Sequence, residues 1–329
     1  MIEHEKYILL INALQESHSI SIKDLSLKLD CDRKAIKEKV IALAELGAPL
    51  KANGQYVSLI RNSYIELLSD LQIRKSLDTQ ANQKEVDIHL FATIGSTNQH
   101  LKNFKTVSGQ NSIVSIAECQ TAGVGRLGKR WVSPFGGNIY FSMRTKVIVP
   151  THKLGSFSLV VGISVIETLR LFGLENLNLK WPNDIYYNGK KLSGVLIEIV
   201  AHDKYSVDLI IGIGINVKMD NRFSANIEQE WIDLDTLTED CIMSRNKIIA
   251  TLINTLHRSI EKYEAEGFSQ FREIWKDVDY LYGKRVDTFG TKNQYSGIAE
   301  GITANGELMI NLDGNVVNIS SGEVSVRLT

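Results

Sequence analysis

The chain has 329 residues, a length that is too great for one average domain and predicts two or three domains. Hydrophobic residues make up 43% of it, which is enough for ordinary cores. Its 37 Lys and Arg nearly balance its 38 Asp and Glu, so the formal net charge of −1 excludes indiscriminate polyanion binding and requires any nucleic-acid contact to come from a local patch. The three cysteines (Cys31, Cys119 and Cys241) are widely spaced and form no CxxC pair, so we expect neither disulfides nor a zinc site. The sequence has no signal pattern and no apolar run of membrane-spanning length, so we expect a cytoplasmic protein without a membrane partner.

Residues 1–62 read as a separate unit of three helices and a hairpin. The helices are expected over residues 6–14, 22–29 and 33–46. Ser21 and Asp32 suit the N-caps of the last two helices, and Asn53-Gly54 is the strongest two-residue hairpin signal. Two helices joined by a tight turn and followed by a β-wing are typical of a winged helix-turn-helix.

The third helix of this unit carries Arg33, Lys34, Lys37 and Lys39. These cations fit either a solvated helix face or a recognition helix that contacts DNA. The near balance of charge in the first sixty residues favours the solvated face, whereas the location of the cations on the third helix favours DNA binding. We expect the four residues to contact DNA.

Two further regions follow a helical linker expected over residues 63–85. Residues 86–281 mix strands with helices, including a long apolar helix over 154–172 and a hairpin over 186–200. Residues 282–329 contain short strands interrupted by glycines, which predicts a small barrel. The fold class is therefore α+β in three domains.

Two short motifs in the central region carry most of the chemical information. The first is Gly123-Val124-Gly125-Arg126-Leu127-Gly128, followed by Lys129-Arg130-Trp131, and the second is Lys180-Trp181-Pro182-Asn183-Asp184. The first matches the G-x-G-x-x-G dinucleotide fingerprint, which requires a helix directly after the glycines. Pro134 and the Gly136-Gly137 pair exclude such a helix. A glycine-rich loop with an arginine inside it remains, and this suits closure over a phosphate.

Together the two motifs resemble those of the biotin protein ligases, which carry G-R-G-R-x-G-R-x-W and K-W-P-N-D in this order. The resemblance extends to Ser96-Thr97-Asn98, to Gln120, and to the segments 192–198 (LSGVLIE) and 212–216 (GIGIN). Val124 departs from the family pattern by replacing its first arginine, while Arg126 keeps the second. If that arginine acts through its side chain, the intermediate should be held more weakly here.

The resemblance implies a central ligase domain of mixed α/β structure similar to class II synthetases, with an SH3-like barrel after it. Lys180 would contact the biotin carboxylate and the α-phosphate, and Arg126 would hold phosphate through its guanidinium. Asp184 would orient Mg²⁺ or Lys180, although Pro-Asn-Asp is also ordinary turn chemistry. A surface lysine and a flexible loop without a role are the plain alternatives for Lys180 and Arg126.

The remaining site residues divide between the two substrates. The biotin-binding residues are expected to be Ser96, Thr97, Asn98, Gln120, Gly123, Val124, Gly125, Arg126, Lys180, Gly194, Gly212 and Gly214. For ATP and the adenylate they are Arg126, Lys129, Trp131, Lys180, Asn183, Asn216, Trp231, Glu323 and Arg327. N-capping by Ser96, a β-bulge at the strand glycines and a core position for Trp231 are the alternatives.

The resemblance thus predicts an ATP-dependent biotin protein ligase, with biotin and ATP as substrates and Mg²⁺ as cofactor, that also represses transcription. Its partners would be a carboxylase biotin carrier domain, operator DNA and, when the adenylate is bound, a second copy of the chain. A lipoate ligase and a ligand-sensing repressor without ligase activity are the alternatives. Lys180 and Arg126 argue against the sensor, because sensing alone does not need an α-phosphate clamp.

Overall fold

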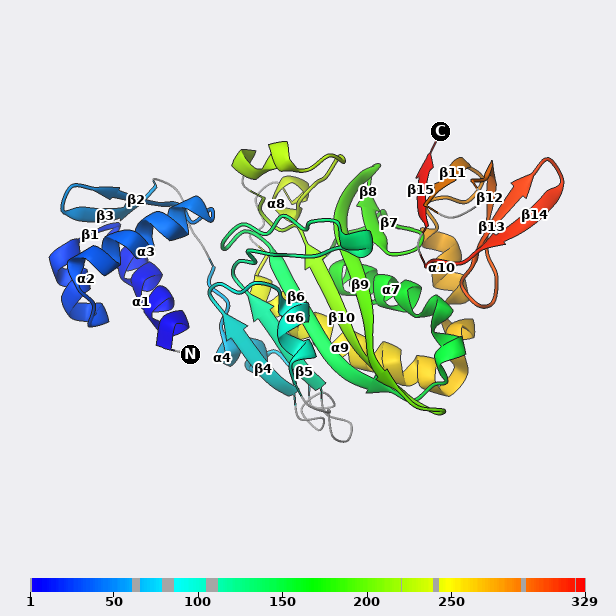
Figure 1. Cartoon of the computed structure of the whole chain (residues 1–329), viewed down its shortest axis with the longest axis horizontal. Helices are drawn as coiled ribbons and strands as arrows, with labels where there is room; N and C mark the ends of the chain where they lie inside the picture. Colours follow the sequence, from blue (N-terminus) through cyan, green and yellow to red (C-terminus); the bar gives the residue numbers. More distant parts are fainter. Residues whose placement is uncertain are drawn as a thin grey trace.

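The computed structural model describes residues 2–60, 66–78, 86–104, 112–219, 221–238, 243–290, 294–322 and 324–328. Three regions follow one another along the long axis of the molecule, with the N-terminal helices at one end and the C-terminal strands at the other (Figure 1). None of the described helices is long and apolar enough to span a membrane.

The N-terminal unit (residues 2–60) contains three helices and a small sheet. The helices are α1 (Ile2–Ser17), α2 (Ile22–Leu29) and α3 (Arg33–Glu45), and the strands are β1 (Ser19–Ser21), β2 (Leu50–Asn53) and β3 (Tyr56–Leu59). The two expected caps are confirmed: Ser21 Oγ accepts from the Asp24 amide at 3.0 Å, and Asp32 Oδ1 accepts from the Lys34 amide at 2.8 Å. Strand β1, which the sequence analysis missed, pairs with β3.

The N-terminal unit packs directly on the central region. The Phe135 amide donates to the carbonyl of Leu46, at the end of α3, at 2.7 Å. The apolar core of the unit continues into Ala92, Cys119 and Phe135. The end of α3 therefore lies against the segment that follows the arginine loop (residues 123–131).

Within the helical linker expected over residues 63–85, the structure describes residues 66–78. In that stretch the helix is α4 (Asp70–Lys75), with Ser69 as its N-cap, and residues 66–69 before it are not helical. Buried Glu118 accepts from the Leu68 amide at 2.6 Å and pairs with Arg245 at 2.8 Å, while Arg245 also donates to the Glu66 carbonyl. These contacts use the backbone groups that a longer helix would need for its own hydrogen bonds.

A seven-stranded sheet forms the centre, in the order β4-β5-β6-β10-β9-β8-β7. Its strands are β4 (Val86–Phe91), β5 (Ser112–Ala117), β6 (Ile139–Val147), β7 (Leu177–Lys180), β8 (Asp184–Tyr187), β9 (Lys190–His202) and β10 (Val207–Ile215). Helices α7 (Phe157–Arg170) and α9 (Arg245–Glu266) cover one face, and α6 (Thr97–Lys102) lies on the other (Figure 1). The expected hairpin over 186–200 and the apolar helix within 154–172 are confirmed by β8, β9 and α7.

Strand β9 is much longer than its neighbour β8. Strand β8 pairs only with residues 190–194 of β9. Val195 is hydrogen-bonded to Asn183, and among the described residues the rest of β9 has no strand partner on that side, so the sheet presents an open edge along residues 196–202.

The C-terminal sheet follows the short helices α8 (Leu234–Leu237) and α10 (Arg272–Val278). Its strands are β11 (Arg285–Phe289), β12 (Ser296–Ile302), β13 (Leu308–Leu312), β14 (Asn315–Ile319) and β15 (Ser325–Leu328), in the order β14-β13-β12-β11-β15. Its apolar core is continuous with that of the central sheet, and the Trp181 indole donates to the carbonyl of Gly306 at 2.9 Å. The C-terminal sheet is therefore fixed to the Lys180–Asp184 segment.

Candidate active site

Strand register brings three separate motifs into one row across the central sheet. Lys180 pairs with Asp184, Asp184 with Gly194, and Gly194 with Gly214. Cross-strand neighbours share a face, so these residues point to the side of the sheet that carries α6. The two glycines at one end of the row leave a shallow floor beside the charged residues Lys180 and Asp184.

The floor is covered by Trp131, the last residue of the arginine loop. A Cβ atom built on Gly214 would collide with the indole, and one built on Gly194 would lie 3.1 Å from it. The indole Nε1 is buried and has no hydrogen-bond partner within the described residues. The strand glycines were expected to face a flat ligand or to form a bulge; β10 shows no register shift at either glycine, and its Gly214 faces Trp131 instead.

Lys191, which the sequence analysis missed, lies at the centre of the row. Its Nζ is 2.8 Å from Asp184 Oδ1 and 5.3 Å from the centre of the Trp131 ring. Only 13% of the Lys191 side chain is exposed. A buried cation over the glycine floor is positioned to meet a carboxylate or phosphate there.

Lys180 lies farther along the same row, with its Nζ 5.2 Å from the centre of the Tyr186 ring. Burial lowers the pKa of Lys180; Asp184 opposes this, and Lys191, Arg327 and Lys129 lower that pKa further. These four charged neighbours show that several cations converge around one carboxylate. Such an excess of positive charge suits an anionic ligand.

Arg126 joins the arginine loop to the C-terminal chain. Its guanidinium donates to Asn183 Oδ1 at 3.3 Å, to the carbonyl of Ser321, and to those of Gly322 at 3.1 Å and Val324 at 3.3 Å. Burial lowers the pKa of Arg126, and Asp184 opposes this effect. The Arg126 guanidinium, which was expected to bind phosphate, thus donates to neutral oxygens of the chain.

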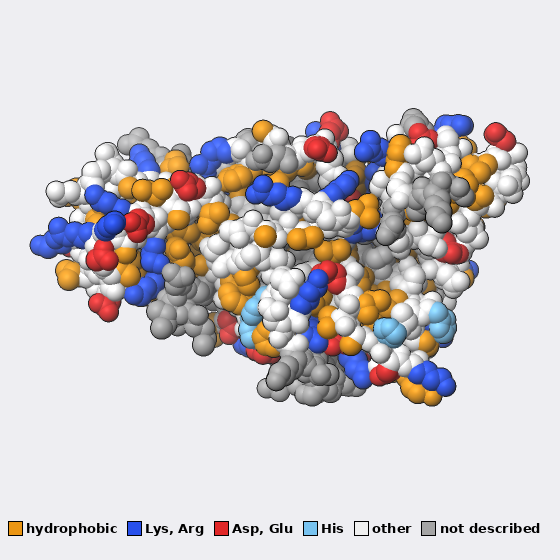
Figure 2. All heavy atoms as spheres, in the orientation of Figure 1, with side chains coloured by type: hydrophobic (Ala, Val, Ile, Leu, Met, Phe, Trp, Pro, Cys, Tyr) orange, Lys and Arg blue, Asp and Glu red, His pale blue; other side chains and the backbone are white. Residues whose placement is uncertain are grey.

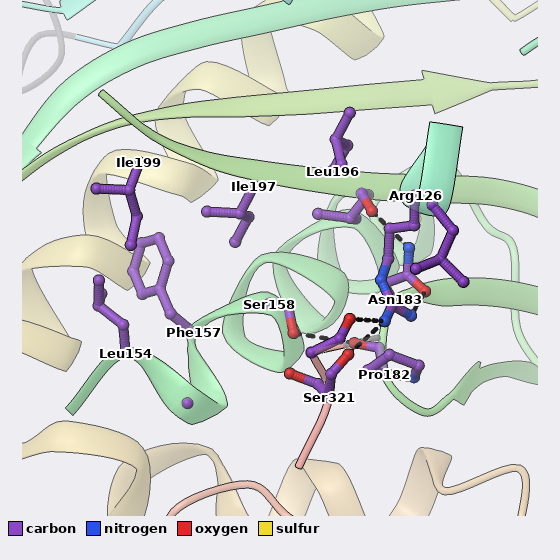
Figure 3. A pocket seen from close by; sticks show the side chains of 14 residues that line it. Arg126, Leu154, Phe157, Ser158, Pro182, Asn183, Leu196, Ile197, Ile199 and Ser321 are labelled. Carbon is purple, nitrogen blue, oxygen red and sulfur yellow. Dashed lines mark hydrogen bonds between the residues drawn. The ribbon is translucent and has the colours of Figure 1, made fainter. Parts of the chain in front are cut away.

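A cavity of about 450 Å³ opens beside Arg126 (Figure 3). Arg126, Asn183 and Ser321 line one end, and apolar side chains from β9 and α7 line the other. The apolar end includes Phe157, Ile197 and Ile199, so the cavity follows the open edge of β9. A segment bound along that edge would reach the arginine loop.

Neutral polar groups gather at the start of α6. Ser96 is its N-cap, and the Thr97 amide and hydroxyl both donate to Gln120 Oε1, at 2.9 and 3.1 Å. Asn98 donates to Glu198 at 2.8 Å and faces Gly212, where a Cβ would collide with its amide. A ureido group needs neutral donors and acceptors of this kind. The structure brings Ser96, Thr97, Asn98, Gln120 and Gly212 together beside the floor.

Within the arginine loop, backbone contacts dominate. The Gly125 amide donates to the Lys129 carbonyl at 2.7 Å, and the Trp131 amide donates to the Gly123 carbonyl at 2.9 Å. The Val124 side chain is half exposed and Val124 forms a bridge with Arg130. The loop around Val124 is therefore held by backbone contacts, and Val124 carries no charge where the family motif has an arginine.

The expected adenylate residues are spread around this centre. Asn183 donates to the Val195 carbonyl at 2.6 Å, and buried Asn216 donates to the Ile232 carbonyl at 3.2 Å. Trp231 is half-buried in a bridge with Lys191, and Arg327 is exposed over Phe289. Lys129 is exposed on the loop, and Glu323 lies outside the described residues.

Asp184 was expected to orient Mg²⁺ or Lys180. Its carboxylate is paired with Lys191, and no group of three or more His, Cys, Asp or Glu side chains that could hold a metal occurs in the described ranges. Mg²⁺ in such sites is held largely by substrate phosphates and water. We therefore treat Mg²⁺ as part of the ATP substrate.

The cations of α3 differ in exposure. Arg33, Lys34 and Lys37 are exposed. The Lys34 Nζ lies 3.9 Å from Glu38 Oε1, so this cation has an acidic neighbour one turn along the helix. Lys39 is half-buried, with its Nζ 5.0 Å from the Tyr7 ring centre, so the sequence expectation of an exposed Lys39 is wrong. Basic and acidic side chains alternate over this end of the molecule (Figure 2).

Comparison with known proteins agrees with this arrangement. Residues 90–216 match the biotin/lipoate A/B protein ligase family, and residues 283–327 match the biotin protein ligase C-terminal domain. The bifunctional ligase/repressor BirA of Salmonella typhimurium is 32% identical over 320 residues, which cover 97% of this chain and 96% of that protein. The biotin–[acetyl-CoA-carboxylase] ligase of Mycobacterium tuberculosis is 30% identical over 72% of this chain and 88% of its own length. The biotin protein ligase of Aquifex aeolicus, solved with biotin and ATP, has a TM-score of 0.64 and 28% identity, covering 74% of this chain and 99% of that one.

Proposed function

The chain belongs to the biotin/lipoate A/B protein ligase family, and we propose that it is a biotin protein ligase that forms biotinyl-5′-adenylate. A biotin carboxylate oxygen attacks the α-phosphorus of ATP, the bond from that phosphorus to the bridging oxygen breaks, and pyrophosphate leaves. The ε-amine of a lysine on a carboxylase carrier domain then attacks the acyl carbon. AMP departs, an amide forms, and the amine loses a proton.

One observation carries this proposal: a row of cations faces a glycine floor beside neutral hydrogen-bonding groups. Two anions, a carboxylate and a triphosphate, must approach each other in the first step. Arg126, Lys180 and Lys191 supply the positive charge that offsets their repulsion and the negative charge developing at phosphorus. Thr97, Asn98 and Gln120 supply neutral groups for the ureido ring.

Lys191 and Lys180 lie at different places in the site and would therefore bind different anionic groups. Lys191 lies over the floor and would meet the biotin carboxylate and the α-phosphate, the contact first expected of Lys180. Lys180, nearer Lys129 and Arg327, would hold the outer phosphates. Mg²⁺ would enter with ATP and neutralise charge on those phosphates.

The adenylate residues would enclose the nucleotide from several sides. Asn183, which is half-buried, and Asn216, which is buried, would contact the phosphate and ribose region. Trp131 and Trp231 would provide apolar surfaces, and Lys129, Arg327 and Glu323 would approach from the arginine loop and the C-terminal chain. The effect of Arg327 and Lys129 on the pKa of Lys180, and the bridge between Trp231 and Lys191, support this assignment.

We also propose the domain assignment of the chain. Residues 1–62 would form a winged helix-turn-helix, residues 63–85 a linker, residues 86–281 the catalytic domain and residues 282–329 an SH3-like barrel. Three helices with a β2–β3 wing support the first, and five short antiparallel strands support the last. Arg33, Lys34 and Lys37 would contact operator DNA, with Lys39 supporting the helix against Tyr7.

The open edge of β9 is a surface for partners of this function. Backbone groups of β9 beyond Val195, along residues 196–202, have no strand partner on this side among the described residues and can add a strand from another chain, and Ile197 and Ile199 offer apolar contacts beside them. The edge would serve a second copy of the chain when the adenylate is bound, and a carrier domain during transfer. Both partners would use the same face.

Biotin-dependent exchange of pyrophosphate into ATP tests the proposal. A biotin ligase catalyses the exchange with biotin and not with lipoate. A lipoate ligase reverses this preference, and a sensing repressor catalyses neither exchange. Either of the last two results would overturn the proposal.

A further inference from the structure

Tyr280 lies outside every motif of the site, yet it belongs to a stack that ends at Lys180. The Tyr186 and Tyr280 rings are 5.1 Å apart at an interplanar angle of 25°. Lys180 Nζ lies over the Tyr186 ring at 5.2 Å, and Lys284 Nζ lies over the Tyr280 ring at 3.7 Å. Four side chains from β7, β8 and the start of the C-terminal region therefore follow one another in contact.

Lys180 needs such support because its charged surroundings are unfavourable. Lys191, Arg327 and Lys129 all repel its ammonium group. The nearby carboxylate of Asp184 is already paired with Lys191 at 2.8 Å. The π face of Tyr186 attracts a cation without bringing a competing negative charge into a site for anions.

Tyr186 is in turn held by Tyr280. Only 7% of Tyr186 is exposed, and burial raises its pKa, so its ring is a neutral apolar surface at physiological pH. Tyr280 is anchored through its own backbone, because its amide donates to the carbonyl of Leu179 at 3.1 Å. Leu179 immediately precedes Lys180, so Tyr280 fixes both the backbone and the ring beside that lysine.

We infer that Tyr280 is a positioning residue for adenylate formation, which acts by stacking on Tyr186 and so directing the Lys180 ammonium group. The inference rests on the proposed function. It gives the end of the catalytic domain, next to the C-terminal region, a part in the first half-reaction. The phenol hydroxyl of Tyr280 is not required for this role, whereas its aromatic ring is.

The test is the rate of biotin-dependent exchange of pyrophosphate into ATP by the full chain. Tyr280→Leu removes the ring, and we expect kcat to fall about tenfold with the KM for biotin unchanged. Tyr280→Phe keeps the ring and should exchange at the wild-type rate. Tyr282→Leu is the matched control, because Tyr282 is two residues away and 67% exposed.

A double variant separates positioning from plain stability. If Tyr280 acts through Lys180, Tyr280→Leu causes no further loss of kcat in a Lys180→Met background. A full additional loss there, a wild-type rate in Tyr280→Leu, or equal damage by Tyr280→Phe would overturn the inference. Should Tyr280→Leu fail to fold by circular dichroism, Tyr280→Met replaces it under the same criteria. A wild-type chain without exchange would overturn the proposed function instead.

Discussion

Replacing Lys191 by methionine removes one charge from the centre of the cation row. Methionine keeps an unbranched side chain of similar length, so packing over Gly194 and beside Trp131 is largely retained. The variant loses the pairing of Nζ with Asp184 Oδ1 at 2.8 Å. We expect adenylate formation to collapse while the fold remains.

The expected magnitude follows from the burial of this cation. Two unit charges 4 Å apart near a protein surface interact by about 4 kcal/mol at an effective dielectric constant of 20. Removal of one donor aimed at developing negative charge costs about 2.7–4 kcal/mol, or roughly two to three decades in rate. The carboxylate of Asp184, left without its partner, would also repel the incoming biotin carboxylate.

Single-turnover formation of biotinyl-adenylate from labelled ATP measures this loss. Lys190→Met is the matched control, since Lys190 is the exposed neighbour on the same strand and should react at the wild-type rate. Adding Asp184→Asn to Lys191→Met should restore part of the rate by removing the unpaired carboxylate. A Lys191→Met rate within threefold of wild type would refute the central placement of this cation.

Other variants test the remaining parts of the site and the N-terminal unit. Lys180→Ala should lower the rate of adenylate formation by roughly two to three orders of magnitude. A near-normal rate in a single-turnover assay would remove Lys180 from the mechanism. Arg126→Gly should release biotinyl-adenylate, measured as increased labelling of lysines on bystander proteins; unchanged bystander labelling with reduced carrier labelling would argue against a role in retention. Deleting residues 1–62 should spare adenylate formation and abolish DNA binding in a mobility-shift assay, and retained binding would place the DNA-binding surface elsewhere. Replacing Lys34 and Lys37 by alanine should make DNA binding less sensitive to salt: the slope of log K for DNA binding against log salt concentration should fall in magnitude by up to about 0.9 for each phosphate that the variant no longer neutralises. An unchanged slope would show that the two lysines belong to a solvated helix face.

Local signals in the sequence were sufficient for many of the elements. Ser21 and Asp32 each cap the helix that was expected after them, because their side chains satisfy amides that the helix leaves free. The linker was predicted less well. The hydrogen bond from the Leu68 amide to Glu118 joins residues fifty positions apart, and no local pattern encodes it.

The sequence analysis missed Lys191 for a geometric reason. Strict alternation from Gly194 places Leu192 on the site face and Lys191 on the opposite face. The β8–β9 register shifts between Ile185 and Tyr186, which leaves Leu192 as the extra residue and returns Lys191 to the site face. Such a shift depends on how two strands pair, so it becomes visible only when the sheet is assembled.

Arg126 links the chemistry of the site to the position of its loop. Its guanidinium has five N–H donors, and those of its two terminal nitrogens are directed at Asn183 and at three carbonyls of residues 321–324. A phosphate that binds the same nitrogens in a bidentate manner must displace some of these carbonyls. Trp131, at the other end of the loop, covers the glycine floor and must yield it to a flat ligand. A ligand bound both at Arg126 and on the glycine floor would therefore require both ends of the arginine loop to exchange partners.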